Sequence, residues 1–284
     1  MDLCFPHAVV LCDSRIFIYP PQSTIKFVIK KGRRLIIPLV VLTVIAFFPK
    51  ALLSDLALRP QEGGVLNLLY AIIVPSRNPM MTMWFLNVLF GVYLIAIPVN
   101  WMVKSNIFGW AIVASISALL SFNLPQIELF GITKIFYFFP YFCLGQICRR
   151  LGILERDYGY NSCLVTLVAL MVFTVMVYLN VEEYILACWG IISAITLIIS
   201  FERAHIPFFP SLRKYTYSIY LLQWFPLVAV RMICYDKLHW NDYVCYVIMF
   251  VMGLFVPIII AKGVSKVVSR NNRWGRFILY SIGM

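Results

Sequence analysis

The amino-acid sequence predicts an all-α membrane protein, a polytopic bundle of about eight transmembrane helices with both termini in the cytoplasm. Of its 284 residues, 62% are hydrophobic and only 13% are charged, so a soluble fold would have too little polar surface. The net charge of +12 needs no nucleic-acid partner, because cytoplasmic loops above an anionic lipid surface carry the same excess of cations. Composition therefore indicates a membrane protein that does not bind nucleic acid.

The first transmembrane helix is expected at residues 35–48, fourteen residues without a charge. At about 1.5 Å per residue this run covers about 21 Å of a hydrocarbon core about 30 Å thick, so flanking residues must complete the crossing. Cations beside a span stay on the cytoplasmic side, which places the N-terminus inside. The cations that precede this span form a basic cluster of Lys30, Lys31, Arg33 and Arg34.

The rest of the chain is expected to form one transmembrane domain, residues 25–268, between an irregular cytoplasmic leader, residues 1–24, and a basic cytoplasmic tail, residues 269–284. The apolar stretch 65–74 is too short to span, and we expect an interfacial or re-entrant helix there. Seven further spans are expected at residues 81–103, 107–122, 134–148, 163–179, 184–201, 215–234 and 244–261.

The distribution of charge agrees with this topology. Eighteen of the 24 Lys and Arg residues lie in segments that the topology places inside, and six lie outside. Short loops with this bias are typical of the cytoplasmic face. The acidic turn of Glu182 and Glu183 is correspondingly expected outside.

The polar side chains of the spans indicate neither a metal site nor ion-coupled transport. The eight cysteines are scattered, without a CxxC pair or a histidine at ligand spacing, so no metal is expected. No Asp, Glu, Lys or Arg lies near the centre of an expected span, and no internal repeat is evident. Transporters commonly have charged residues near the membrane midplane and internal repeats, so a transporter or flippase is the weaker alternative.

Four motifs in the same order resemble the membrane-bound acyltransferase 3 family, over roughly residues 25 to 260. Residues 27–38 (FVIKKGRRLIIP) are similar to the start of that family's third helix, which carries an R-x-x-R pair. Residues 83–86 (MWFL), 138–145 (FFPYFCLG) and 217–222 (YSIYLL) are similar to three later helices of the family.

The resemblance implies an enzyme that transfers an acyl group, usually acetyl, from cytoplasmic acyl-CoA to a sugar hydroxyl of a cell-surface polysaccharide or lipid-linked glycan. It implies a multi-pass protein of the bacterial plasma membrane, with acyl-CoA as a substrate and no bound cofactor. Lys31 and Arg34 match the two basic positions of the R-x-x-R pair, so they are the candidate donor-binding residues. Lysine at the first position keeps the charge but lacks the bidentate guanidinium.

Four other residues are candidates for the wall of an active-site cavity, each with a structural alternative. Trp84 is equally typical of an interfacial anchor, and Asn87 is equally typical of a helix-packing contact. The hydroxyls of Ser218 and Tyr220 are suited to an acceptor path, although hydroxyls in membrane helices commonly bond the backbone one turn earlier.

The family has ten helices, and the first carries the histidine that acts as a base. No such helix precedes Lys26, so the sequence looks like a member without its first two helices, and the catalytic residue is not assigned. His205 and His239 match no family motif. We therefore expect the chain to insert into a membrane without transferring an acyl group, because an uncharged hydroxyl needs a placed base. A non-catalytic membrane subunit is the corresponding alternative.

Overall fold

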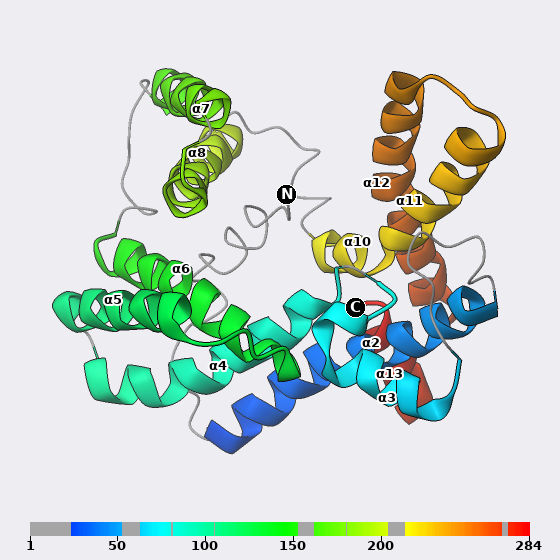
Figure 1. The fold of residues 1–284 in the computed structure, drawn as a ribbon, viewed down its shortest axis with the longest axis horizontal. Helices are drawn as coiled ribbons and strands as arrows, with labels where there is room; N and C mark the ends of the chain where they lie inside the picture. Colours follow the sequence, from blue (N-terminus) through cyan, green and yellow to red (C-terminus); the bar gives the residue numbers. More distant parts are fainter. Residues whose placement is uncertain are drawn as a thin grey trace. The chain divides into compact units, whose positions relative to one another are not determined.

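The computed structural model describes residues 24–52, 63–80, 82–104, 106–152, 162–179, 181–203, 214–268 and 272–284 (Figure 1). Within these ranges the chain forms eleven α-helices, two short 3-10 helices and one π-helix, and no strand. The all-α prediction is confirmed for this part of the chain. The expected leader lies almost wholly outside the described residues, since α2 begins at Thr24.

The chain is divided into two compact units. The first unit contains Met1–Lys26, Gly91–Ile127 and Ile132–Phe209, so it includes the first three residues of α2 (Thr24–Leu52). Its helices are most of α4 (Trp84–Val103), α5 (Ile107–Asn123), α6 (Ile132–Arg150), α7 (Ser162–Tyr178) and α8 (Glu183–Arg203).

The second unit contains Phe27–Phe90, Glu128–Gly131 and Pro210–Met284. It holds the start of α4 and the following elements: α2 (Thr24–Leu52), α3 (Val65–Ile73), η3 (Pro75–Arg77), η4 (Leu129–Gly131), α10 (Thr216–Leu222), α11 (Trp224–Val230), η6 (Arg231–Lys237), α12 (Asp242–Val267) and α13 (Arg273–Ser281). Gly283, after the end of α13, packs closely on α10, where a Cβ at this glycine would lie only 2.7 Å from Cδ1 of Tyr217.

Three of the described helices are long and apolar enough to cross a membrane, namely α2, α4 and α12. The pair formed by α10 and the α11–η6 segment adds a fourth if it is counted as one bent span. Shorter apolar helices occur at Ile107–Asn123, Leu164–Tyr178 and Ile185–Ala194. The described residues thus give a multi-pass membrane protein with three to four candidate spans by length and composition, whereas about eight spans were predicted.

Helix α2 is long enough to cross a membrane, although the predicted first span was too short to do so by itself. It runs for 29 residues from Thr24 to Leu52, whereas the predicted span covers only residues 35–48. At about 1.5 Å per residue the helix is about 43 Å long, which exceeds a hydrocarbon core of about 30 Å. The basic cluster therefore lies inside the helix and not in a loop before it.

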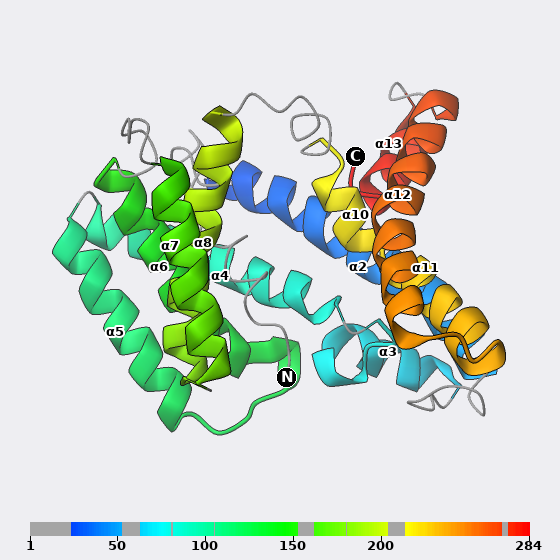
Figure 2. The ribbon, with the colours of Figure 1, turned by 90° about the horizontal axis from the view of Figure 1, so that it is seen from above.

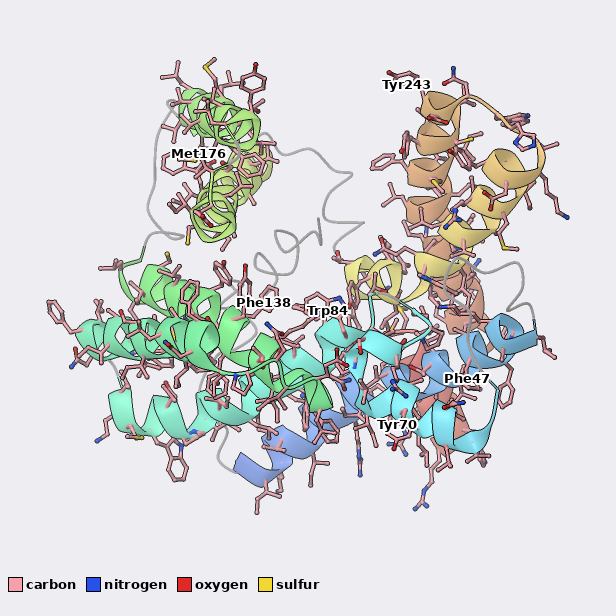
Figure 3. All side chains as sticks on the ribbon, viewed as in Figure 1. Phe47, Tyr70, Trp84, Phe138, Met176 and Tyr243 are labelled. Carbon is pink, nitrogen blue, oxygen red and sulfur yellow. The ribbon has the colours of Figure 1, made fainter. Side chains whose placement is uncertain are left out.

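Helix α3 agrees with the predicted non-spanning segment at residues 65–74. It has nine residues and leaves large apolar side chains exposed, among them Val65, Leu66 and Tyr70, the last of which is labelled in Figure 3. A helix of this length cannot cross a bilayer, and its exposed apolar face is suited to an interface.

The predicted seventh span at residues 215–234 is not one continuous helix. Helices α10 and α11 meet at Gln223, and the bend between the two halves of the span is 47°. Pro226 has no N–H to donate to the carbonyl of Leu222, so the break has an identifiable cause. The π-helix η6 then places Arg231 beside Asp236, with 3.9 Å between guanidinium and carboxylate.

Pairs of neighbouring helices pack through aromatic rings and small hydrogen-bonding side chains. In the first unit α5 and α6 lie side by side, where the Trp110 and Phe142 rings are 6.0 Å apart and Ser117 donates to the carbonyl of Phe136 (Figure 2). Helices α7 and α8 are joined by Trp189 and Ser193, which both donate to the carbonyl of Ala169. Such contacts hold membrane helices together where no hydrophobic effect acts between them.

Gly91→Val is expected to lower the stability of the first unit by about 1–3 kcal/mol through overpacking. A Cβ at Gly91 on α4 would lie 2.2 Å from Cδ1 of Ile135 on α6, a side chain that is itself buried. Gly263→Val on α12 is the matched control, because no atom lies within 4 Å of its Cβ position. The midpoint of thermal unfolding in detergent should fall for Gly91→Val only, and equal midpoints would contradict the close packing.

Candidate functional site

Helix α10 contacts the basic cluster of α2 through Tyr217. The Cζ atom of Arg34 lies 5.1 Å from the centre of the Tyr217 ring, a cation–π distance. The Tyr217 hydroxyl donates to the backbone carbonyl of Arg34 at 2.8 Å. The hydroxyl bond anchors Tyr217 on the backbone of α2, and its ring then lies against the guanidinium of Arg34, a residue exposed at the surface of the second unit.

Lys31 lies one turn before Arg34 on the same helix, so the two predicted donor-binding residues share a face. Its Nζ atom lies 5.5 Å from the centre of the Phe27 ring, and the residue is half-buried. Lys30 and Arg33 are exposed on the same turns. The structure therefore places a pair of cations, each beside an aromatic ring, along one side of α2.

The other side of α10 contacts the start of α4. The Tyr220 hydroxyl donates to the backbone carbonyl of Thr82, and its ring meets the Phe85 ring at 5.9 Å and 70°. Trp84 packs edge-on against the same Phe85, with 6.0 Å between ring centres. Two of the predicted cavity residues, Trp84 and Tyr220, therefore flank one buried phenylalanine.

The region where α2, α10 and the start of α4 meet is called the α2–α4–α10 junction. Two buried hydroxyls at this junction have no hydrogen-bond partner in the described part of the chain. They belong to Ser218, whose side chain is fully buried on α10, and to Thr82, just before α4. Buried polar atoms are normally satisfied, and Ser115 shows the usual solution by donating to the carbonyl of Ala111. Ser218 does not make that bond, so its hydroxyl is available to another partner.

Asn87 is used for helix packing. Its side-chain amide is 7% exposed and donates to the carbonyl of Ile72 at 3.3 Å, which ties α4 to α3. Asn87 therefore makes the helix-packing contact that was its alternative role, and a contact with a substrate stays a prediction.

No histidine or carboxylate lies among the contacts that join α2, α4 and α10 in the described residues. His239 is described, but it lies between η6 and α12. The same residues contain no group of three metal-ligating side chains. What this junction offers a substrate is positive charge, aromatic rings and hydroxyls.

Tyr217 and Thr82 are site residues that the sequence did not single out. Tyr217 belongs to a recognised motif, but it meets Arg34 across 183 residues of sequence, and no local pattern predicts that contact. Thr82 contributes its backbone carbonyl, which every residue type has, so the sequence could not identify it as an acceptor.

The family comparison covers nearly the whole chain. The profile described as "Acyltransferase domain", of the acyltransferase 3 family, matches residues 9–262, which begins earlier than the resemblance seen in the motifs. No curated protein and no solved structure matches the chain. Because the matched range contains every element of the α2–α4–α10 junction, the transporter alternative is set aside, and the chain belongs to the acyltransferase 3 family of membrane acyltransferases.

Proposed function

We propose that the protein transfers an acetyl group from cytoplasmic acetyl-CoA to a sugar hydroxyl of a cell-surface polysaccharide or lipid-linked glycan, in the bacterial plasma membrane. The observation that carries the proposal is the contact of Arg34 with Tyr217, which holds a guanidinium at a defined place inside the matched family region. CoA is a polyanion, and a guanidinium binds phosphate oxygens by two parallel hydrogen bonds. Lys31 adds a second positive charge on the same face of α2.

The acceptor side of the reaction is assigned to Trp84, Ser218 and Tyr220. Attack of the sugar hydroxyl on the thioester carbonyl forms the ester, breaks the C–S bond and releases the CoA thiolate, which takes up the hydroxyl proton to leave as the thiol. The base that would relay this proton is not assigned to a described residue. The unpartnered Ser218 hydroxyl and the Trp84 ring are the kinds of group that orient a sugar. Ser218 lies on α10, and the Trp84 ring packs on Phe85, which contacts Tyr220 of α10. Tyr220 holds α10 against α4 and so keeps these groups together.

The function is tested with the protein in lipid nanodiscs, [14C]acetyl-CoA and a mixture of glycan acceptors. Alkali-labile label in the glycan fraction, above that with empty nanodiscs, supports O-acetyl transfer. Saturable binding of acetyl-CoA without transfer to any glycan contradicts the proposed transfer and supports the non-catalytic alternative, which is expected if the family's first two helices are absent. Absence of both binding and transfer contradicts the proposal.

The eight-span topology with both termini inside is supported by contacts that join loops predicted on the same side. Arg150 donates to the carbonyl of Lys104 at the predicted inner face. At the predicted outer face, Ser76 donates to Glu128 at 2.7 Å and Lys50 donates to the carbonyl of Pro79.

Single cysteines in a cysteine-free background test this topology. A membrane-impermeant maleimide is expected to label Asn123→Cys and Lys237→Cys in intact cells, and to label Leu151→Cys and Lys266→Cys only after the membrane is opened. All four residues are exposed in the structure. Labelling of all four positions from one side would contradict the topology.

A further inference from the structure

A second group of cations surrounds the residue just before α10. The Nζ atoms of Lys214 and Lys262 each lie 5.7 Å from the centre of the Tyr215 ring. Lys214 is next to Tyr215 in sequence, whereas Lys262 comes from the last turns of α12. Packing of α10 against α12 therefore brings two ammonium groups to one half-buried ring.

This group and the candidate donor site both lie at the start of α10. Tyr215 and Tyr217 are two residues apart in the sequence, and Tyr217 carries the Arg34 contact. Three segments of the second unit, α2, the residues before α10 and α12, thus supply cations to two tyrosines at the start of α10. All three segments belong to one compact unit.

No carboxylate contacts Lys214 or Lys262 in the described residues. The ion pair described in the second unit, Arg231 with Asp236, lies in η6. Two cations beside one ring, without a carboxylate partner, create a positive potential there that favours an anion. Cation–π contacts with Tyr215 hold the two ammonium groups in place before the anion arrives.

We propose that Lys214 and Lys262 bind the 3′-phosphate of the acyl-CoA donor, while Arg34 and Lys31 bind its diphosphate. A phosphate monoester carries close to two negative charges at neutral pH, whereas each phosphate of a diphosphate ester carries one. Two lysines match the monoester, because an ammonium acts as a compact point charge with freely rotating donors. This assignment rests on the proposed donor, and it adds the residues that distinguish CoA from donors without the 3′-phosphate.

The phosphate of an anionic lipid headgroup has similar chemistry, so the test must separate the two sources. Binding of acetyl-CoA and of acetyl-3′-dephospho-CoA is measured for the wild type, Lys262→Gln, Lys214→Gln and Lys237→Gln in phosphatidylcholine nanodiscs. Lys237→Gln is the matched control, since it removes the same charge from an exposed lysine at the other end of the α11–α12 hairpin.

The wild type and Lys237→Gln are expected to bind acetyl-CoA about 10- to 100-fold more tightly than the dephospho form. Lys262→Gln and Lys214→Gln are each expected to reduce this ratio by about tenfold, mainly through weaker acetyl-CoA binding. Lys262→Arg keeps the charge and should keep most of the ratio.

An unchanged ratio in both lysine variants, or equal losses for both donors, overturns the assignment. If the lysine variants instead lose co-purified phosphatidylglycerol while the ratio stays unchanged, the site binds lipid and the assignment is wrong. Failure of the wild type to bind either donor overturns the proposed function as well, and this outcome is distinct from the others.

Discussion

Arg34→Gln is expected to weaken acetyl-CoA binding about 10- to 100-fold, because a charge-assisted hydrogen bond to phosphate is lost. Arg34 is exposed, yet its guanidinium lies against the ring of Tyr217, which is itself anchored by its hydroxyl bond to the Arg34 carbonyl. A restrained guanidinium loses little rotamer freedom when the donor binds, so more of the interaction appears as affinity.

Arg33→Gln is the matched control for this change. Arg33 is the adjacent exposed cation in α2, and the same charge is removed while Arg34 and Tyr217 stay in place. Arg34→Lys should lie between the wild type and Arg34→Gln, since the charge remains and the bidentate geometry is lost. Tyr217→Phe should weaken binding by less than Arg34→Gln, because it keeps the ring and removes only the hydroxyl bond.

Isothermal titration of acetyl-CoA at several salt concentrations measures these differences. The loss in Arg34→Gln should shrink as salt rises, because the contact joins exposed charges in a wet site. Equal affinity of Arg34→Gln and Arg33→Gln at low salt would mean that the basic cluster only orients the first span.

Asn78→Leu is expected to destabilise the second unit by about 2–4 kcal/mol, the largest effect on stability among the changes considered. The Asn78 side chain is 7% exposed and donates to Oγ1 of Thr43 at 2.8 Å and to the carbonyl of Ala71 at 3.0 Å. Its own oxygen accepts from the backbone N–H of Met80 at 2.9 Å. One side chain therefore joins α2, α3 and the segment before α4.

Leucine has a similar volume but no polar atom, so the buried N–H of Met80 and hydroxyl of Thr43 would each lose a partner. Asn67→Leu serves as the control, because Asn67 makes a single exposed bond to the carbonyl of Gly63. Unfolding in SDS, followed by far-UV circular dichroism, should show a lower midpoint for Asn78→Leu and little change for Asn67→Leu. Similar midpoints would contradict the role of Asn78 in joining α2, α3 and the segment before α4.

Part of the candidate site was predicted from the sequence, namely the residues that lie close together in one motif. Lys31 and Arg34 stand in one helical motif, so their shared face follows from a spacing of three residues. Trp84 and Tyr220 were named from separate motifs, and only the structure shows that they flank Phe85. Tyr215, Lys214 and Lys262 were counted as parts of a span and of cytoplasmic loops, because a cation beside a span is ordinarily a topology signal.

The sequence by itself determined the class, the helical fold and the family. Composition excludes a soluble fold, apolar runs require helices because lipid satisfies no backbone hydrogen bond, and four motifs in order indicate acyltransferase 3. These properties depend on neighbouring residues in the chain, so they can be derived without knowing which helices touch.

Only the tertiary structure decided where α2 begins, where the late span bends and which side chains meet at α10. Helices that are apolar on all sides carry no periodic stripe to mark their packing face. Helix α12 is an example, because it exposes Phe250, Ile259 and Tyr243, the last of which is labelled in Figure 3. The partners are then selected by small residues, single hydrogen bonds and aromatic contacts between segments far apart in sequence. Arg34 and Tyr217 are such a pair, because 183 residues separate them and the contact exists only once α2 and α10 have packed.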